Sequence, residues 1–308
     1  MFKFKNIRVK DEASILTKRT KGEKVIYGIA FVVFAIYSIA LLYPLVYLFV
    51  NSFQDPDVYL SNRISGGHSP FELPSVWMFK NYADAMKICF YDTLGQPIYL
   101  PEMFFNSLWY CGIAVGGQVL MSCFTGYIMS KYRFKGREII YALAIFSMTI
   151  PVVGNTGAMF KLVSDLNIYN TPFFLITALS GWGFNFMVMY GFFQSVSWSY
   201  AEAVFLDGGG HFSAFFKVML PQAKMSVVTL LIVSLIQTWN NYLTPLLYLP
   251  DFPTIASGLY QLKLTAVRAS NMPYYYAGLM LSALPIVILY ACFSDVIMKN
   301  FSVGGLKG

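Results

Sequence analysis

Residues 25–50 read VIYGIAFVVFAIYSIALLYPLVYLFV, a run of 26 residues without Asp, Glu, Lys or Arg. A helix needs roughly 20 residues to cross about 30 Å of hydrocarbon, so this run can span a bilayer. Further uncharged stretches fill residues 103–130, 139–160, 166–201, 225–250 and 269–294. The sequence therefore predicts an all-α polytopic membrane protein with six transmembrane helices.

The composition excludes most soluble classes. Hydrophobic residues make up 57% of the 308-residue chain and charged residues 12%, whereas soluble domains carry roughly 25% charged residues. Hydropathy that is high over whole segments also differs from the alternating pattern of a membrane β-barrel. No metal site is expected, because the four cysteines form no CxxC pair and the two histidines, His68 and His211, lie far apart in the sequence.

The basic residues are unevenly distributed between the two sides of the predicted membrane. Residues 1–24, 131–137 and 195–224, with those after 298, hold sixteen of the 22 Lys and Arg residues. Short cytoplasmic segments are enriched in Lys and Arg, so both termini are predicted to be cytoplasmic. The net charge of +7 is thereby explained as an orientation signal, without nucleic acid as a partner.

These signals predict the order of segments along the chain. Residues 1–24 form a basic cytoplasmic segment, and the large extracytoplasmic excursion at 51–102 should contain a short helix around 79–86. The predicted spans are 25–50, 103–130, 139–160, 171–194, 225–250 and 278–298. A cytoplasmic loop at 195–224, an extracytoplasmic loop at 251–277 and a cytoplasmic tail at 299–308 complete the chain.

A stripe of small residues runs along the second predicted span. Gly112, Gly116, Ser122, Gly126 and Ser130 recur at near-helical spacing, which lets two helix backbones approach closely in lipid. The stripe could contact a partner subunit or another helix of the same chain. Packing within the chain is the favoured interpretation.

The cytoplasmic stretch 198–221, WSYAEAVFLDGGGHFSAFFKVMLP, is too long and too apolar for a simple connection. Ser199 and Glu202 have the spacing of a capping box, which predicts a short helix from Tyr200 that the Gly208–Gly210 run ends after Leu206. A second short helix fits residues 212–219. Ala203, Phe205, Phe215 and Phe216 are then available as contacts of a compact docking element on the inner face of the membrane.

This stretch resembles the EAA loop of ABC-transporter permeases, in which Glu-Ala-Ala, two variable residues and Asp-Gly-Ala precede a Leu-Pro pair. The matching residues are Glu202, Ala203, Asp207, Gly208, Leu220 and Pro221, while Val204 and Gly209 stand where the pattern has alanine. The wider chain resembles the second permease subunit of carbohydrate importers of the maltose type. That resemblance rests on Ser52 and Phe53, residues 167–171 and 239–242, and the tail 304–308.

The resemblance implies a non-catalytic subunit of a type I ABC importer for an oligosaccharide, in a prokaryotic cell membrane. Its implied partners are a second permease, two cytoplasmic ATPase subunits and an extracytoplasmic solute-binding protein, which in the maltose type is contacted by the segment matching 259–270. The implied ATPase-coupling residues are Glu202, Ala203, Asp207, Gly208, Gly209, Leu220 and Pro221; for Glu202 alone, helix capping is the alternative. The chain has no GxxxxGK[ST] phosphate loop, so ATP hydrolysis is assigned to a partner, and no cofactor is expected.

Uncharged polar side chains within the spans are the candidates for the translocation pathway, because amides and aromatic rings suit sugars. They are Gln118, Asn185, Gln237, Asn240, Asn241 and Tyr242, flanked by Trp182 and Trp239. Interhelical hydrogen bonding is the alternative role for each amide. A secondary transporter or channel is the runner-up function, but ion coupling usually requires an intramembrane ionisable group, and the uncharged stretches contain none. A membrane enzyme is disfavoured because no catalytic cluster is evident.

Overall fold

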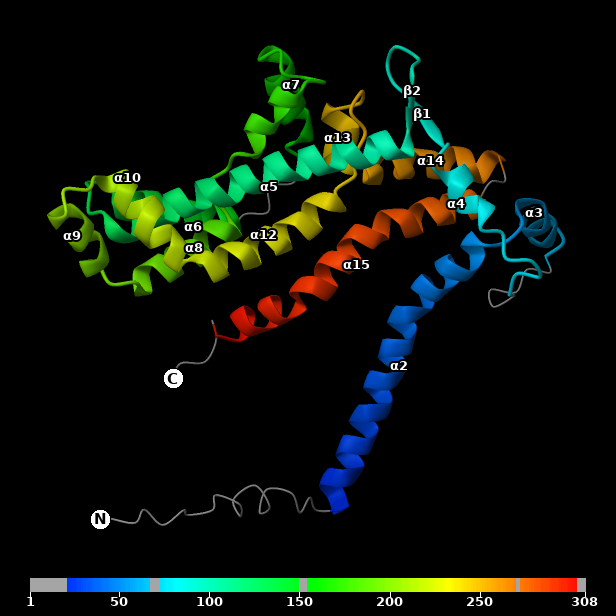
Figure 1. The fold of residues 1–308 in the computed structure, drawn as a ribbon, viewed down its shortest axis with the longest axis horizontal. Coiled ribbons are helices and arrows are strands. Elements are labelled where there is room, and N and C mark those ends of the chain that lie inside the picture. The colour runs from blue at the N-terminus through cyan, green and yellow to red at the C-terminus, as the bar shows by residue number, and fades with distance from the viewer. Residues whose placement is uncertain (1–20, 67–72, 150–153, 270–271, 304–308) are drawn as a thin grey trace.

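The computed structural model describes residues 21–66, 73–149, 154–269 and 272–303 (Figure 1). Most of the predicted basic segment at 1–24 and the Gly-rich tail at 304–308 lie outside these residues. Helices dominate the described chain, which confirms the predicted all-α class. One antiparallel hairpin accompanies them, with Phe90 of β1 (Cys89–Tyr91) opposite Ile98 of β2 (Pro97–Tyr99).

The helices follow in a simple order. The outer excursion contains α3 (Pro56–Ile64) and α4 (Lys80–Ala85), and the latter confirms the short helix predicted around residues 79–86. The remaining helices are α2 (Lys21–Ser52), α5 (Leu100–Lys131), α6 (Arg137–Thr149), α7 (Thr156–Asp165), a 3-10 helix (Pro172–Ala178), α8 (Phe184–Ser195), α9 (Ser199–Leu206), α10 (His211–Ala214), a π-helical turn (Phe215–Met219), α11 (Leu220–Gln222), α12 (Lys224–Trp239), α13 (Leu243–Tyr248), α14 (Ile255–Ala269) and α15 (Met272–Val303).

Three described helices are long and apolar enough to cross a membrane: Gly22–Ser52, Leu100–Lys131 and Met272–Ser294. A fourth span is possible if His211–Gln222 and Lys224–Trp239, which meet at a bend of 76°, are taken together. The predicted spans 139–160, 171–194 and 225–250 correspond to shorter pieces of helix. The total of six spans and their bounds therefore stay predictions, although the multi-pass, helical architecture is plain.

Helix α5 is the axis of the body, and α8, α12 and α14 pack along it. The hairpin lies at one end of α5, and α9 and α10 lie at the other (Figure 1). One apolar core near the hairpin includes Met103, Trp239 and Ile255, which are all buried. A second core near α9 and α10 includes Tyr127 and Phe193. The body thus has two halves, one near the hairpin and one near α9 and α10, joined by one long helix.

The small-residue stripe of α5 is divided between two environments. A Cβ added at Gly126 would lie 2.9 Å from both the Cβ atom of Met189 and the backbone nitrogen of Tyr190, so α8 fits closely against this glycine. This contact agrees with packing within the chain. At Gly112 and Gly116 an added Cβ would meet nothing within 4 Å in the described chain. That half of the stripe is open to lipid or to another subunit.

Helix α2 stands clear of the body along most of its length (Figure 1). Its apolar side chains are widely exposed, for example Phe31 at 74%. Its last turns are held firmly, because the side-chain amide of Asn81 donates to the carbonyl oxygens of Ser52 and Gln54 at 2.9 and 2.8 Å. The ring of Phe53 packs among four aromatic neighbours there, Phe49, Trp77, Phe79 and Tyr82.

Asp251 holds three segments together: the hairpin turn, the segment before the 3-10 helix and the loop before α14. Its carboxylate accepts hydrogen bonds from the backbone N–H of Thr93 at 2.8 Å, the Thr93 hydroxyl at 2.9 Å and the Asn170 amide at 2.5 Å. Burial alone would raise the pKa of Asp251, but these donors outweigh it and hold the pKa below its usual value. Asp251 is therefore a carboxylate at neutral pH.

This network predicts a pH-dependent contribution to stability. Because the folded-state pKa of Asp251 is depressed, the contribution is present above the unfolded-state value of about 4 and is lost as the pH falls through the folded-state pKa. Asp251→Asn should reduce the free energy of unfolding by about 1 kcal/mol at pH 7 and by less at low pH, measured by denaturant titration in detergent. Asp165→Asn, at an exposed position, is the matched control. Equal pH profiles for the Asp251 variant and the parent would contradict the assignment.

Candidate functional site

Residues 198–222 form a compact unit at the end of α5 opposite the hairpin, here called the coupling element. Helix α9 occupies Ser199–Leu206, so the first predicted helix is confirmed with its start one residue earlier. The predicted capping box is wrong, because Trp198 holds the cap position and makes no side-chain cap bond. Ser199 instead pairs with the Ser197 hydroxyl at 2.8 Å. Glu202 is exposed and forms no ion pair with the described residues, so its carboxylate is available to another molecule.

The glycine run ends α9 in a defined geometry. Gly208 has φ +80°, the left-handed conformation that L side chains adopt only with strain. Its N–H donates to the carbonyl of Phe205 at 3.0 Å, and the N–H of Gly209 donates to that of Val204 at 2.8 Å. This pair of bonds is a Schellman motif with Asp207 at the C-cap. The Asp-Gly pair therefore fixes the corner between α9 and α10.

The two departures from the EAA pattern compensate for each other. A Cβ added at Gly209 would lie 2.5 Å from Cγ1 and 2.9 Å from the carbonyl oxygen of Val204, the residue that replaces the second alanine of the pattern. The larger side chain at position 204 thus occupies the space that an alanine at position 209 would need. The two positions are separate in the sequence, but they are in contact in the folded corner.

This contact predicts that a substitution at position 204 can restore transport that a substitution at position 209 has reduced. Gly209→Ala should lower the stability of the corner by about 1–3 kcal/mol through overpacking, and ATP-dependent transport should fall with it. Adding Val204→Ala removes the overlap with Cγ1 and should restore part of the transport, because the contact with the carbonyl oxygen of residue 204 remains. Uptake by the two single variants and the double variant, at equal membrane levels, gives the coupling between the sites. Simple additivity would show that the positions are independent.

The second half of the coupling element is anchored rather than free. Residues 212–219 are helical, as predicted, but as α10 followed by a π-helical turn. The prediction that Phe215 contacts a partner is wrong, because its ring is buried and stacks on Phe124 of α5 with centroids 4.4 Å apart. Phe216, also predicted as a contact, is 46% exposed, and the most exposed side chains are Leu206 at 89% and Phe212 at 74%. Together with exposed Glu202 and Ala203, they form the outward surface of the element.

Contacts with the end of α5 fix the position of the coupling element. The Lys131 ammonium donates to the carbonyl oxygen of Val196, where α8 ends. The Tyr132 hydroxyl and Nδ1 of His211 are 2.8 Å apart and hydrogen-bonded. The rings of Trp198 and His211 pack edge-on against Tyr132. A displacement of the element would therefore be transmitted to both α5 and α8.

Leu220 and Pro221 lie at the end of the coupling element, next to α12. They lie in α11, and both line an apolar groove of about 510 Å³ between α5 and α12. Gly116 of the small-residue stripe also lines this groove. The Leu-Pro pair is thus placed at the bend between the element and the helix that follows it.

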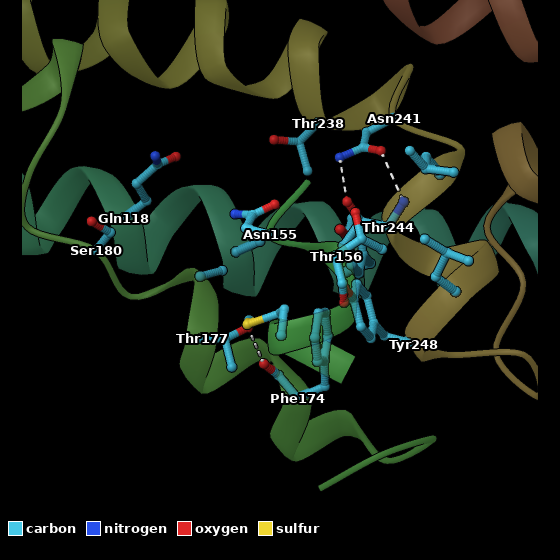
Figure 2. Close-up of a pocket in the computed structure, with 16 residues that line it drawn as sticks. Gln118, Asn155, Thr156, Phe174, Thr177, Ser180, Thr238, Asn241, Thr244 and Tyr248 are labelled. Atoms are coloured by element: carbon cyan, nitrogen blue, oxygen red, sulfur yellow. Dashed lines mark hydrogen bonds between the residues drawn. The ribbon is translucent and has the colours of Figure 1, made fainter. Parts of the chain in front are cut away.

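A polar cavity of about 490 Å³ lies along the middle of α5 (Figure 2). Its polar lining comes from side chains of five elements and the segments beside them: Tyr110, Gln118, Asn155, Thr156, Thr177, Ser180, Thr238, Asn241, Thr244 and Tyr248. Figure 2 shows the amides of Gln118, Asn155 and Asn241 around one space. The size is within the range of small-molecule sites.

The cavity lies where the chain departs from regular helix. The 3-10 helix and α8 are separated by residues 179–183, which include Ser180, and α12 and α13 are separated at Asn241. Asn155 and Thr156 lie at the start of α7. Irregular backbone at membrane depth is tolerated where it is buried in protein or lines a water-filled space. The interrupted helices and the polar lining thus point to the same region as a route for a polar solute.

The predicted pathway residues fall into two groups in the structure, those that line the cavity and those that do not. Asn241 and Gln118 line the cavity, although Asn241 also forms hydrogen bonds with Thr244 of α13 at 3.0 and 3.1 Å. The Asn185 amide instead donates to the Ser234 hydroxyl at 3.0 Å, an interhelical bond between α8 and α12.

The other three candidates do not line the cavity. Gln237 is exposed, and the Asn240 amide bonds to the carbonyl of Ile236 in its own helix. Tyr242 stacks on Tyr260 of α14 with centroids 4.4 Å apart. Sequence analysis missed Asn155 and Thr156, whose only signal was an Asn-Thr pair next to a glycine within an apolar run.

The chain combines apolar helices long enough to cross a membrane with a polar cavity along α5, an arrangement that suits a transport permease. The chain belongs to the family of binding-protein-dependent transport system inner membrane components, which matches residues 118–302. The resemblance to ABC-importer permeases found in the sequence is thereby confirmed.

Similar proteins cover nearly the whole chain. The diacetylchitobiose uptake system permease protein NgcG of Streptomyces coelicolor is 25% identical over 88% of this chain and 86% of its own length. The maltodextrin transport system permease protein MalD of Streptococcus pneumoniae is 28% identical over 88% and 92%. A chain from the crystal structure of a bacterial ABC transporter that imports alginate shares the fold, with a TM-score of 0.72, 20% identity and coverage of 90% and 98%.

Proposed function

We propose that this chain is one of two permease subunits of an oligosaccharide importer, driven by two cytoplasmic ATPase subunits and supplied by an extracytoplasmic binding protein. The observation that carries the proposal is the coupling element: an exposed Glu202 and Leu206 on a short helix whose end is fixed by Gly208. The class of substrate is supported by the similarity to the diacetylchitobiose and maltodextrin permeases and by the polar cavity.

The coupling element would transmit ATPase movement mechanically. The outward surface of α9 and α10 enters a socket on the ATPase, with Leu206 and Phe212 supplying apolar contact and Glu202 the charged contact. Movement of the element is passed on through the Phe215–Phe124 stack and the Lys131–Val196 bond. Because these contacts hold the element to α5 and α8, closure of the ATPase dimer would turn the helices that border the cavity.

The cavity would form this subunit's share of the sugar pathway. Amides and hydroxyls both donate and accept hydrogen bonds, which matches the hydroxyl groups of a sugar. The aromatic side chains of Tyr110, Phe174 and Tyr248 line the same space and offer surfaces for C–H faces of the sugar ring. With no charged side chain among its lining residues, the cavity favours a neutral solute.

Two amides give a direct test of the cavity. Gln118→Leu and Asn155→Leu should each lower kcat/KM for sugar uptake about fivefold, the effect of losing one hydrogen bond of roughly 1 kcal/mol. Basal ATPase activity should be unchanged. Gln237→Leu makes the same change outside the cavity and serves as the control. Equal uptake by all three variants and the parent would exclude the cavity from the pathway.

Reconstitution tests the proposed function as a whole. Proteoliposomes containing both permeases and the ATPase should import chitooligosaccharides or maltooligosaccharides only with ATP and the binding protein. Uptake by the permeases without the ATPase would instead support a secondary transporter. ATP-driven uptake of a non-carbohydrate solute alone would overturn the substrate class but leave the importer assignment in place.

The proposed orientation has the hairpin outside and both termini in the cytoplasm. It is supported by the bias of basic residues and by the positions of the hairpin and the coupling element at opposite ends of α5. In spheroplasts, a cysteine replacing exposed Ser65 should react with an impermeant maleimide, and one replacing Lys135 should react only after permeabilisation. The reverse pattern would invert the topology.

A further inference from the structure

Two adjoining pockets lie beside the end of α5, and one of them also borders α10 of the coupling element. The first, of about 440 Å³, has an aromatic wall that includes Phe124, Tyr127 and Phe215. The second, of about 630 Å³, is lined by residues 133–134 and 136–139. Arg133 and Phe134 line both pockets, so a single elongated molecule could occupy the two spaces. One part of this combined site is apolar and the other is polar.

The polar part is basic. The segment between α5 and α6 carries Arg133, Lys135 and Arg137, and within the described chain none of them forms an ion pair. Arg133 and Arg137 line the second pocket together with one acid, Glu138. Lys131 lines neither pocket, and its ammonium donates to the carbonyl oxygen of Val196. The pocket therefore retains a net positive charge beside an apolar cavity.

The location limits the kind of ligand. Helix α5 is long and apolar enough to span the membrane, and the basic segment begins where it ends, on the side that the charge bias assigns to the cytoplasm. Basic pockets between helices on this side of a membrane suit anionic lipid headgroups. Guanidinium groups bind phosphate through two parallel hydrogen bonds. A free phosphate ion would leave the adjoining apolar pocket empty.

We propose that this site binds an anionic phospholipid of the cytoplasmic leaflet. Its phosphate lies between Arg133 and Arg137, and one acyl chain follows the aromatic wall past Phe134 toward Phe124 of α5. The inference goes beyond the proposed import function, because it assigns this segment a lipid ligand. The lipid contacts both α5 and the coupling element, since His211 and Phe215 belong to that element and line the apolar pocket.

Photocrosslinking in the complete importer tests the identity of the occupant. Benzoylphenylalanine replaces Phe134, and the importer is placed in nanodiscs with equal amounts of phosphatidylglycerol and phosphatidylcholine. The lipid adduct at this position should be several-fold enriched in phosphatidylglycerol over the bulk. The same probe at Phe146, an exposed residue of α6, should report the bulk ratio. An unenriched adduct at position 134, or an adduct with the ATPase or the second permease, would overturn the proposal.

Charge removal tests the headgroup contacts. Arg133→Gln with Arg137→Gln should weaken phosphatidylglycerol retention about 30-fold by native mass spectrometry, since each basic residue near the surface contributes roughly fivefold. Lys80→Gln with Lys161→Gln removes the same charge from exposed positions elsewhere and should leave retention unchanged. If the Gln variant inserts poorly into the membrane, the double variant Arg133→Lys with Arg137→Lys serves in its place, because it retains both charges. It should still prefer phosphatidylglycerol over phosphatidylcholine. Undiminished retention in an inserted Gln variant, or no lipid preference in the Lys variant, would contradict the site.

Discussion

Replacing Gly208 with proline is expected to abolish ATP-dependent uptake while leaving the subunit in the membrane. Gly208 has φ +80°, whereas the proline ring fixes φ near −65°, so the corner after α9 cannot form. Proline also removes the N–H that donates to the carbonyl of Phe205. The two effects together cost roughly 3 kcal/mol or more at a corner that must present Glu202 and Leu206 in one orientation. Co-purification of the ATPase should fall in parallel with uptake.

Two companion variants separate backbone geometry from general disruption. Gly208→Asn should retain much of the transport, because asparagine tolerates the left-handed conformation better than other L residues. Gly95→Pro places the same residue at another glycine with positive φ, in the outer hairpin, and should leave ATPase binding intact. Full transport by the Gly208→Pro subunit, at normal membrane levels, would remove the corner from the coupling mechanism.

The second large effect is expected at Gly126, where a leucine should prevent α5 and α8 from packing. An added Cβ would already lie 2.9 Å from Met189 and Tyr190, and one of these contacts is with backbone, which cannot rotate away. The remaining atoms of leucine would force the helices apart. We expect a loss of about 3 kcal/mol in stability and little folded subunit, measured by thermal unfolding in detergent.

Gly112→Leu is the matched control on the same helix. An added Cβ there meets nothing within 4 Å in the described chain, so the isolated subunit should unfold at nearly the parent temperature. If Gly112 packs against the second permease, the same variant will fold but fail to assemble. Equal unfolding temperatures for Gly126→Leu and Gly112→Leu would contradict the division of the stripe.

Local signals predicted the corner of the coupling element better than its surface. Gly208 ends α9 as expected, because a run of glycines determines backbone conformation locally. The roles of Ser199 and Phe215 were wrong, since one depends on a helix start one residue earlier and the other on the packing of a short helix against α5. The outward-facing residues of a short helix are set by its tertiary contacts, which spacing alone does not provide.

The pathway illustrates a second limit of sequence reasoning. Hydropathy predicts continuous spans at 171–194 and 225–250, but the helices are interrupted at residues 179–183 and 240–242. An apolar run can span a membrane without being one helix, so the interruptions that admit polar side chains are not encoded by hydropathy. The amides of Asn185 and Asn241 look equivalent in the sequence. Their difference arises from the partner of Asn185, the Ser234 hydroxyl, which lies 49 residues away in the chain.

The separation of α2 from the body has a consequence for biosynthesis. The ribosome produces α2 long before α15, yet the last turns of α2 and the adjoining α3 pack against that late helix. The hydroxyls of Tyr59 and Tyr276, 217 positions apart, meet at 3.1 Å in this contact. Contacts of such long range cannot form until the final helix has emerged. Through most of translation α2 thus lacks its contacts with α15, and during that interval its apolar side chains are open to capture by an insertion chaperone or by another membrane helix.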